Sequence, residues 1–289
     1  MKFGLWFCNT GHYVEPKEAV ALAQAAEGAG FESLWTVEHT IVPAGYASAY
    51  PYDASGKMPG GRDDFPLPDP LIWMAFVAAA TTRINLATGI LILPQHNPVL
   101  AAKQIATLDH LSRGRVMLGV GVGWLREEFA ALGVPFEERG ARTDEYIAAM
   151  RELWSAEKPT FKGRFVEFKD AYCRPQPVNK IVPIIVGGHS DAAARRAGRL
   201  GDGFFPASRE FAPLIATARN AADEAGRDPE KLEITVSIPE DPAQLDLLRR
   251  QGVHRVLVPS ISGRRLNPPI RGPEDLASWT ERIKRYAAV

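Results

Sequence analysis

The sequence predicts a (β/α)8 barrel, and three observations support this prediction. Short apolar runs alternate with helix-like segments along the whole chain, as in a parallel sheet whose strands are joined by helices. Eight such runs can be counted, which is the number of strands that closes a barrel of this kind. The length of 289 residues suits one barrel with insertions, so we expect a single domain over residues 1–289.

The expected strands begin close to the N-terminus and end near residue 258. They cover Phe3–Phe7, Ser33–Val37, Ile84–Leu93, Arg115–Val122, Val182–Val186, Gly203–Phe205, Leu232–Ile238 and His254–Val258. Capping residues and prolines mark the starts of the helices between them. The first helix covers Pro16–Ala29, and the others begin near Asp69, Asn97, Trp124, Ser190, Glu210, Asp241 and Pro273.

Two insertions interrupt this alternation. Thr40–Pro68 is rich in Pro, Gly, Tyr and Asp and follows the second strand, at the end of a barrel where active sites lie. A long loop in that place predicts a functional role. Lys158–Lys180 predicts a small β-hairpin before the fifth strand, flanking the cofactor pocket or capping the barrel.

The segment Asn97–Trp124 joins a helix, a turn and a buried strand without a gap. Asn97 is a good N-cap, and Pro98 suits the first helical turn, where its missing N–H costs nothing. Val116–Val120 is apolar without polar alternation, which is typical of a strand covered on both faces. The segment therefore predicts one helix–strand unit of a parallel sheet.

Glycines follow this strand at Gly119, Gly121 and Gly123. Without a Cβ, they would let a flat ligand approach the backbone. A dinucleotide fingerprint is not indicated, because the third glycine of GxGxxG would fall at Trp124 or Arg126.

Composition excludes several classes of function. Acidic and basic residues number 34 each, so no broad attraction to nucleic acid or to an anionic membrane is expected. No apolar stretch reaches the roughly 18 residues of a membrane span. The two cysteines, Cys8 and Cys173, provide neither a disulfide framework nor a metal clip. We expect a reduced, cytoplasmic protein without a metal site.

Four further segments support one interpretation of the chain. They are AEGAGFESLWTVEH (26–39), DPLIWMAFVAAATTRINLATGILILPQHNP (69–98), RGARTDEYIAAMRELW (139–154) and PIIVGGHSDAAARRAGRLGDGFF (183–205). Together with the 97–124 segment they resemble the luciferase-like monooxygenase superfamily, and in particular its coenzyme F420-dependent oxidoreductases. The resemblance implies a barrel enzyme that acts on a small molecule.

His39 ends the second expected strand beside Glu38. Imidazole can donate or accept a proton near neutral pH, which suits a hydride transfer that a proton must balance. In F420-dependent relatives the matching His, preceded by an acidic residue, lies near the deazaflavin ring, so the resemblance implies catalytic roles for His39 and Glu38. The alternative is that both residues only hold the start of the long loop.

The resemblance also implies where a cofactor binds. A bulge at Gly89–Ile90, often with a cis peptide, would press against its ring, unless Gly89 is simply a small residue in a crowded core. The segment 186–191, VGGHSD, would hold its phosphate at a helix start, although Ser190 could be a plain N-cap. The full set of expected cofactor-binding residues is Gly89, Ile90, Asn97, Gly121, Gly123, Trp124, Gly187, Gly188, His189 and Ser190.

The expected substrate is flat and apolar. Relatives that oxidise a sugar phosphate place a Glu directly after the last glycine of the fourth strand's exit, where this chain has Trp124. Aromatic residues are also available in the long loop, which favours an apolar ligand. The expected substrate-binding residues are Trp6, Cys8, Tyr46 and Tyr50.

Three functions remain open at this point. The first is hydride exchange between F420 and an organic substrate. The second is a reaction that uses FMN. Reduced FMN activates oxygen, whereas a deazaflavin activates it poorly. The third is a flavin-binding barrel without activity. By analogy with the family, we also expect a homodimer.

Overall fold

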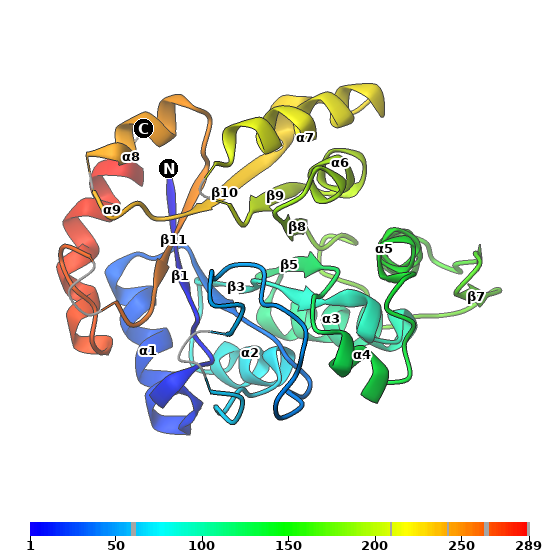
Figure 1. The fold of residues 1–289 in the computed structure, drawn as a ribbon, viewed down its shortest axis with the longest axis horizontal. Helices are drawn as coiled ribbons and strands as arrows, with labels where there is room; N and C mark the ends of the chain where they lie inside the picture. Colours follow the sequence, from blue (N-terminus) through cyan, green and yellow to red (C-terminus); the bar gives the residue numbers. More distant parts are fainter. Residues whose placement is uncertain (59–61, 209, 242, 263–265, 288–289) are drawn as a thin grey trace.

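A computed structural model describes residues 1–58, 62–208, 210–241, 243–262 and 266–287. Its parallel strands form a closed barrel (Figure 1). The barrel strands, in ladder order, are β1 (Lys2–Trp6), β2 (Ser33–Thr36), β3 (Asn85–Thr88), β5 (Val116–Gly121), β8 (Ile184–Gly188), β9 (Gly203–Pro206), β10 (Glu233–Ser237) and β11 (Arg255–Pro259). Because β11 pairs with β1 and β3 pairs with β5, the ring closes. The predicted (β/α)8 barrel is confirmed.

Helices cover the outside of the barrel. They are α1 (Pro16–Ala29), α2 (Pro70–Ala78), α3 (Pro98–Ser112), α4 (Arg126–Ala131), α5 (Arg139–Ser155), α6 (Asp191–Leu200), α7 (Ala212–Glu224), α8 (Gln244–Arg250) and α9 (Thr280–Ala287). Short 3-10 helices lie at η1 (Gly11–Val14), η2 (Leu93–Gln95), η3 (Pro229–Lys231) and η4 (Pro273–Trp279). Among the described residues, no helix is long and apolar enough to cross a membrane.

The sequence signals for helix starts act as expected. The side chains of Asp69, Asn97 and Ser190 each accept a hydrogen bond from the first turn of α2, α3 and α6, respectively. Each satisfies a backbone N–H that the helix itself leaves without an acceptor.

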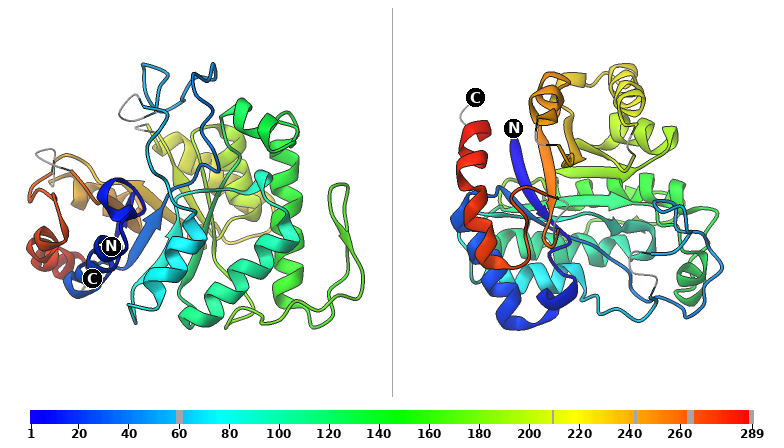
Figure 2. Two further views of the ribbon diagram at one scale, coloured as in Figure 1. Left: turned by 90° about the horizontal axis from the view of Figure 1, so that it is seen from below. Right: turned by 60° about the vertical axis from the view of Figure 1, so that its left-hand side comes forward.

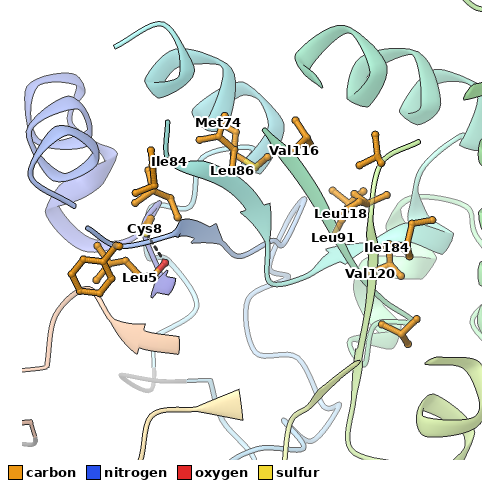
Figure 3. Packing of buried hydrophobic residues seen from close by; sticks show 14 of the residues in the cluster. Leu5, Cys8, Met74, Ile84, Leu86, Leu91, Val116, Leu118, Val120 and Ile184 are labelled. Carbon is orange, nitrogen blue, oxygen red and sulfur yellow. Dashed lines mark hydrogen bonds between the residues drawn. The ribbon is translucent and has the colours of Figure 1, made fainter. Parts of the chain in front are cut away.

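Apolar packing occurs on both sides of the strands. The larger cluster lies between strands and helices and includes Leu86, Leu118 and Met74 (Figure 3). A smaller cluster fills the barrel interior, with Trp35 at its centre. Its other buried members are Ala87, Met117, Ile185, Phe205 and Leu257.

Two predicted elements differ in detail. The expected strand Ile84–Leu93 is interrupted, because a cis peptide between Gly89 and Ile90 separates β3 from β4 (Leu91–Ile92). The expected bulge is thus present. The helix expected near Trp124 is only the six-residue α4, and α5 is the long helix that leads to β8.

The predicted hairpin is formed by β6 (Phe161–Lys162) and β7 (Glu167–Phe168), which pair antiparallel. In Figure 2 (left) it projects to the side, away from the loop after β2, which extends beyond one end of the barrel. Glu145 of α5 accepts hydrogen bonds from three successive hairpin N–H groups, at residues 164–166. Glu145 therefore anchors the hairpin to the barrel.

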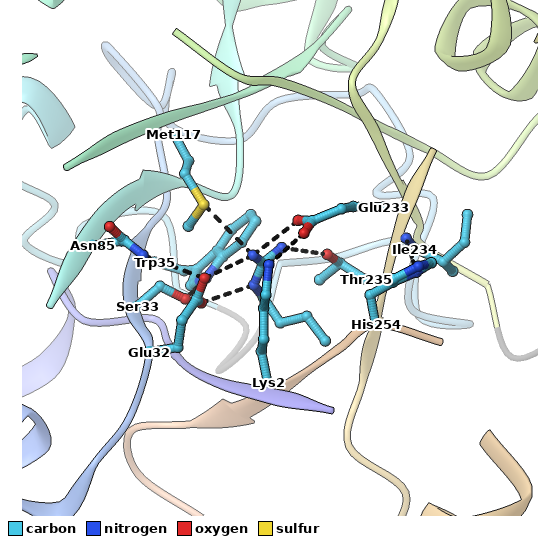
Figure 4. A network of polar contacts seen from close by, with 11 residues as sticks. Lys2, Glu32, Ser33, Trp35, Asn85, Met117, Glu233, Ile234, Thr235 and His254 are labelled. Carbon is cyan, nitrogen blue, oxygen red and sulfur yellow. Dashed lines mark hydrogen bonds and ion pairs between the residues drawn. The ribbon is translucent and has the colours of Figure 1, made fainter. Parts of the chain in front are cut away.

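An ionic network closes the opposite, N-terminal end of the barrel (Figure 4). Arg255 is fully buried and donates to both oxygens of Glu32 at 2.9 Å and to Glu233 at 3.1 Å. Its guanidinium also lies over the ring of Trp35, 5.5 Å from the centroid. Lys2 pairs with Glu233 at the rim. These residues belong to β1, β10 and β11 and to the entry of β2, so the network joins the two ends of the chain.

One side chain holds both ends of the loop that follows β2. The amide of Asn9, which is fully buried, donates to the carbonyl oxygens of Val37 and Pro68 and accepts from the Val37 N–H. The loop therefore begins and ends at the same point above β1.

Candidate active site

The candidate site lies where the parallel strands end, beneath the loop after β2. This loop carries a small apolar cluster of Tyr46 and Met58 with Leu125 at the start of α4. Partly buried members of the same cluster are Val42, Tyr50, Phe65 and Trp124. The loop is therefore packed onto the exit of β5, which places its aromatic residues at the barrel mouth.

His39 is held by a carboxylate that the sequence analysis did not identify. Its Nδ1 lies 2.9 Å from Oε2 of Glu128, and the Glu128 side chain is fully buried. The other oxygen of Glu128 accepts the N–H groups of Thr40, at 2.6 Å, and Ile41. A carboxylate only accepts, so the proton of neutral His39 is on Nδ1 and its Nε2 has the free lone pair.

The neighbouring Glu127 fastens the middle of the loop. Its carboxylate accepts from the N–H groups of Ala47 and Ser48 and from the Ser48 hydroxyl. The Ser48 hydroxyl bond and these N–H groups lower the pKa of Glu127 to about 2. The first turn of α4 thus holds His39 and the start of the loop with Glu128 and the middle of the loop with Glu127.

Trp124 is the centre of an aromatic wall. Its ring makes edge contacts with His39, Tyr46 and Tyr50, with centroids 5.3 to 5.7 Å apart. Edge-to-face packing of this kind holds rings in fixed orientation. Tyr46 is held further by its hydroxyl, which accepts from the Met58 N–H. Tyr46 is buried, so the half-buried rings of Trp124 and Tyr50 form the surface of the wall beside His39.

Glu38 points away from His39 and into the protein. One of its oxygens accepts from the Ile92 N–H on β4, and the other lies 2.8 Å from Nε2 of His96. The side chain is only 3% exposed. Burial lowers the pKa of His96, but the hydrogen bond and charge of Glu38 outweigh burial and raise it above its ordinary value. His96 is a second residue that the sequence analysis did not identify.

The space beside the strand-end glycines is filled by protein. A Cβ on Gly121 or on Gly187 would come within 2.6 Å of the Ile90 side chain, and one on Gly123 within 2.7 Å of Ile92 and Phe129. The expectation that these glycines leave an open wall for a ligand is therefore corrected. Gly121 and Gly187 are required because Ile90 lies across them, and Gly123 because Ile92 and Phe129 lie beside it. Ile90 in turn faces the mouth.

Gly89 is supported from within the barrel. Trp6 donates its Nε1–H to the Gly89 carbonyl at 3.1 Å and stacks on Phe7, with centroids 4.1 Å apart. Phe7 has a left-handed backbone, with φ of 61°, which is uncommon for a bulky residue and is typical of functional sites. Trp6 thus lies beneath the bulge, and its predicted contact with substrate stays a prediction.

The expected phosphate cradle lies at the start of α6. Gly187 and Gly188 end β8, and the hydroxyl of Ser190 caps the helix through Ala193 N–H. His189 is exposed and meets the ring of Tyr52 from the loop, with centroids 5.1 Å apart. The loop after β2 therefore reaches across the mouth to this turn.

Two predicted residues have other roles in the structure. Cys8 is fully buried in the cluster between strands and helices, and its thiol donates to the Leu5 carbonyl, so its predicted substrate contact is wrong. Burial raises the pKa of this thiol well above its usual range. The Asn97 side-chain oxygen is used in capping α3, which leaves only its amide nitrogen for a ligand.

Comparison with known proteins agrees with the fold and the sequence resemblance. Residues 1–240 match the family described as luciferase-like monooxygenase. An uncharacterized protein of Mycobacterium tuberculosis is 32% identical over 286 residues, covering 98% of this chain and 97% of that protein. The F420-dependent glucose-6-phosphate dehydrogenase of Kineococcus radiotolerans is 32% identical over 244 residues, or 79% of this chain and 66% of that enzyme.

Among solved structures, a monooxygenase from Streptomyces bottropensis has a TM-score of 0.76 at 24% identity, covering 99% of this chain and 100% of that one. This likeness concerns the fold. The match over most of the length to a single family, with F420-dependent enzymes among the relatives, confirms the resemblance found in the sequence. The chain is an oxidoreductase and belongs to the luciferase-like monooxygenase family.

Proposed function

We propose that this protein is an F420-dependent oxidoreductase that transfers a hydride between the deazaflavin and an organic substrate with a flat, apolar body. The observation that carries this proposal is the His39–Glu128 pair, which lies beside the aromatic wall of Trp124. Hydride transfer needs a group that moves a proton, next to a site that excludes water. The relatives named as F420-dependent dehydrogenases support the cofactor class.

The residues at the mouth fit a flavin-like group. Ile90, Trp124 and His39 provide apolar and aromatic surface for a ring. At the start of α6, helical geometry leaves the N–H groups of Asp191 and Ala192 without an acceptor, and the helix dipole favours an anion there. Gly187–Ser190 would hold the phosphate, and F420, when bound, supplies the hydride or accepts it.

His39 would move the proton that balances the hydride. Because Glu128 accepts from Nδ1, the proton is exchanged at Nε2. Both oxygens of Glu128 are occupied, one by His39 and the other by the N–H groups of Thr40 and Ile41. Glu128 therefore orients His39 but does not itself reach a substrate.

The aromatic wall supports an apolar substrate rather than a sugar phosphate. Trp124 occupies the place where sugar-phosphate relatives are expected to have a carboxylate, and Tyr46 and Tyr50 extend the same wall. Burial, together with the neighbouring Tyr52, raises the pKa of Tyr50 to about 12, so its hydroxyl stays neutral at physiological pH. Neutral aromatic groups favour flat, uncharged ligands.

Titration of the purified protein with F420 and with FMN tests the cofactor. We expect F420 to bind more tightly, measured by the change in its fluorescence. Tight FMN binding with no F420 binding would contradict the proposal and favour an oxygen-activating enzyme. If neither bound, the flavin-dependent function itself would be ruled out.

We also propose that the protein forms a homodimer through the outer faces of α2 and α3. Ile72 and Phe76 lie one turn apart on α2 and are 72% and 49% exposed, and Leu100 and Leu111 on α3 are 57% and 71% exposed. The two helices pack side by side, so these residues supply apolar surface on neighbouring elements. Light scattering tests the proposal: Ile72→Glu should give monomers, whereas Leu247→Glu, on α8, should not.

A further inference from the structure

His96 has no role in the function proposed above, although it is bonded to a predicted catalytic residue. It follows η2, and its backbone N–H donates to the Leu93 carbonyl, which fixes the start of its side chain. Its Nε2 lies 2.8 Å from Oε1 of Glu38. The imidazole is 20% exposed, whereas Glu38 is almost completely enclosed. A buried carboxylate of this kind requires a charged or hydrogen-bonding partner, and His96 supplies it.

Glu38 connects His96 to the strand that carries the bulge. The second oxygen of Glu38 accepts from the Ile92 N–H, and Ile92 pairs with Gly121 of β5 in the ladder. Two residues earlier, the Ile90 side chain lies against Gly121 and Gly187 at the mouth. The orientation of the Glu38 carboxylate therefore sets the position of β4 and, with it, of Ile90.

The groups around His96 are acidic. They are Glu38 after β2, Asp69 at the cap of α2 and Glu128 on α4. The negative charges of all three raise the pKa of His96, whereas burial lowers it. A positively charged ring makes a stronger hydrogen bond to a carboxylate than a neutral one does. The same acidic groups make this bond dependent on pH, because the charge is lost as the pH rises through the raised pKa of His96.

We propose that His96 is a positioning residue, which acts through Glu38 to hold β4 and Ile90 in the geometry that receives the cofactor ring. The proposal depends on the proposed function, because it takes the ligand to be a deazaflavin or flavin. The way in which His96 acts is argued from the contacts of Glu38. Loss of His96 should weaken cofactor binding without removing any group that touches the phosphate turn at α6.

The test uses His96→Ala, His96→Gln, Glu38→Gln and the double variant His96→Ala/Glu38→Gln. His110→Gln, at an exposed histidine of α3, is the matched control. Dissociation constants for F420 and FMN are measured by fluorescence between pH 6 and pH 9. We expect His96→Ala to weaken binding by about tenfold, and His96→Gln, which keeps an N–H donor, to restore most of it.

Two further signatures separate positioning from a general structural role. Wild-type affinity should fall as the pH rises through the titration of His96, whereas the affinity of His96→Gln should be unaffected by that titration. In the double variant, the loss of cofactor affinity should not exceed the larger of the two single-variant losses, because both changes interrupt the same connection. Additive losses, or unchanged affinity in His96→Ala, would overturn the proposal.

Failure of the proposed function would be recognised separately. If the wild type bound neither cofactor, that function would be refuted. The coupling between His96 and Glu38 would then be measured by NMR titration of the His96 ring. A lower titration point in Glu38→Gln than in the wild type would support the coupling to Glu38. An identical titration point in both proteins would overturn the positioning role as well.

Discussion

His39 has one ring nitrogen available for chemistry because Glu128 binds the other. The two residues are 89 positions apart, and their contact depends on the short helix α4, whose first turn aims Glu128 beneath the loop after β2. The adjacent Glu127 makes a similar number of contacts but only with loop residues. Both acids therefore attach the loop, but only Glu128 also orients the imidazole.

Replacement of His39 should remove turnover but not the cofactor. We expect His39→Ala to lower kcat by at least about 100-fold, the typical contribution of a general acid or base, while the F420 dissociation constant changes little. Steady-state kinetics and fluorescence titration measure the two quantities. A large loss of affinity would instead mark His39 as a binding residue.

Glu128→Gln should act on the rate, with Glu127→Gln as its control. Without the carboxylate, the His39 ring loses the acceptor that fixes its orientation, so we expect kcat to fall by about 10- to 100-fold, as for other residues that orient a catalytic group. The dissociation constant for F420 should change little, because both oxygens of Glu128 are bonded within the protein. Glu127→Gln should leave kcat nearly unchanged. Equal losses of kcat in both variants would contradict the orienting role.

Glu128 and His96 were not found from the sequence for a physical reason. Each is identified by a partner far along the chain, Glu128 by His39 and His96 by Glu38, and residue order gives no sign of these pairings. The one local signal is the pair of acids in the first turn of a helix, which is common because it complements the helix dipole. His39 and Glu38, in contrast, end a recognisable strand, and so their location at the mouth could be predicted.

Among the helices, α6 and α7 show how closely two elements can approach when one carries glycine. A Cβ at Gly198 would overlap the Ala218 carbonyl oxygen and lie 2.7 Å from the Ala222 nitrogen of α7. Gly28 in α1 has open space around the same position and is exposed. The two glycines therefore differ in packing although both lie within helices.

Alanine at these two sites should have opposite effects on stability. Gly198→Ala must separate α6 from α7, and we expect it to lower the free energy of unfolding by about 1–3 kcal/mol, the usual cost of overpacking. Gly28→Ala should raise it by about 0.5–1 kcal/mol, because alanine favours the helix. Urea unfolding followed by circular dichroism measures both. Stabilisation by Gly198→Ala would show that the helices can move apart freely.

Element types were predictable because apolar periodicity and capping signals act locally. Asp69, Asn97 and Ser190 cap helices as expected, and the eight strands lie where the apolar runs are. The interruption after Thr88 was expected only through the family resemblance, and the shortness of α4 was not predicted, because both depend on contacts across the barrel. Gly121 of β5 illustrates the same limit: its position was informative, but the side chain that lies across it, Ile90, comes from the bulge between β3 and β4.

For the whole molecule, the Arg255 network determines how the barrel closes. It joins β1, β10 and β11 to the entry of β2, and its central pair spans 223 residues of sequence. Burial raises the pKa values of Glu32 and Glu233, but the bonds and charge of Arg255 outweigh burial and lower both below the ordinary value of 4.5. The native state therefore depends on both carboxylates being ionised.

Arg255→Met should destabilise the whole barrel. We expect a loss of about 3 kcal/mol in the free energy of unfolding, near the lower limit for a broken buried pair because the two carboxylates keep some contact with water. Lys2→Met, at the exposed rim of the same network, should change it by less than about 1 kcal/mol. Urea titration at pH 7 compares the two. Equal effects would mean that the network acts through net charge alone.

The same network should make the fold sensitive to acid. Carboxylates with lowered pKa values contribute stability above about pH 4.5 that is lost as the pH falls through their folded-state values. The difference in unfolding free energy between wild type and Arg255→Met should therefore narrow as the pH falls below about 4.5. A difference that is constant over this range would show that packing of Arg255 on Trp35, rather than its charge, provides the stability.

The attachment of the loop after β2 has a consequence for how this barrel can change. Because Asn9 binds the chain at Val37 and again at Pro68, the two ends of the loop are fixed at one point of the barrel. Lengthening a closed surface loop costs little entropy, only about 0.6 kcal/mol for each doubling. A replacement for residues 40–67 that again offers backbone N–H groups to Glu127 and Glu128 should therefore graft a new substrate preference onto the barrel without any change to its strands.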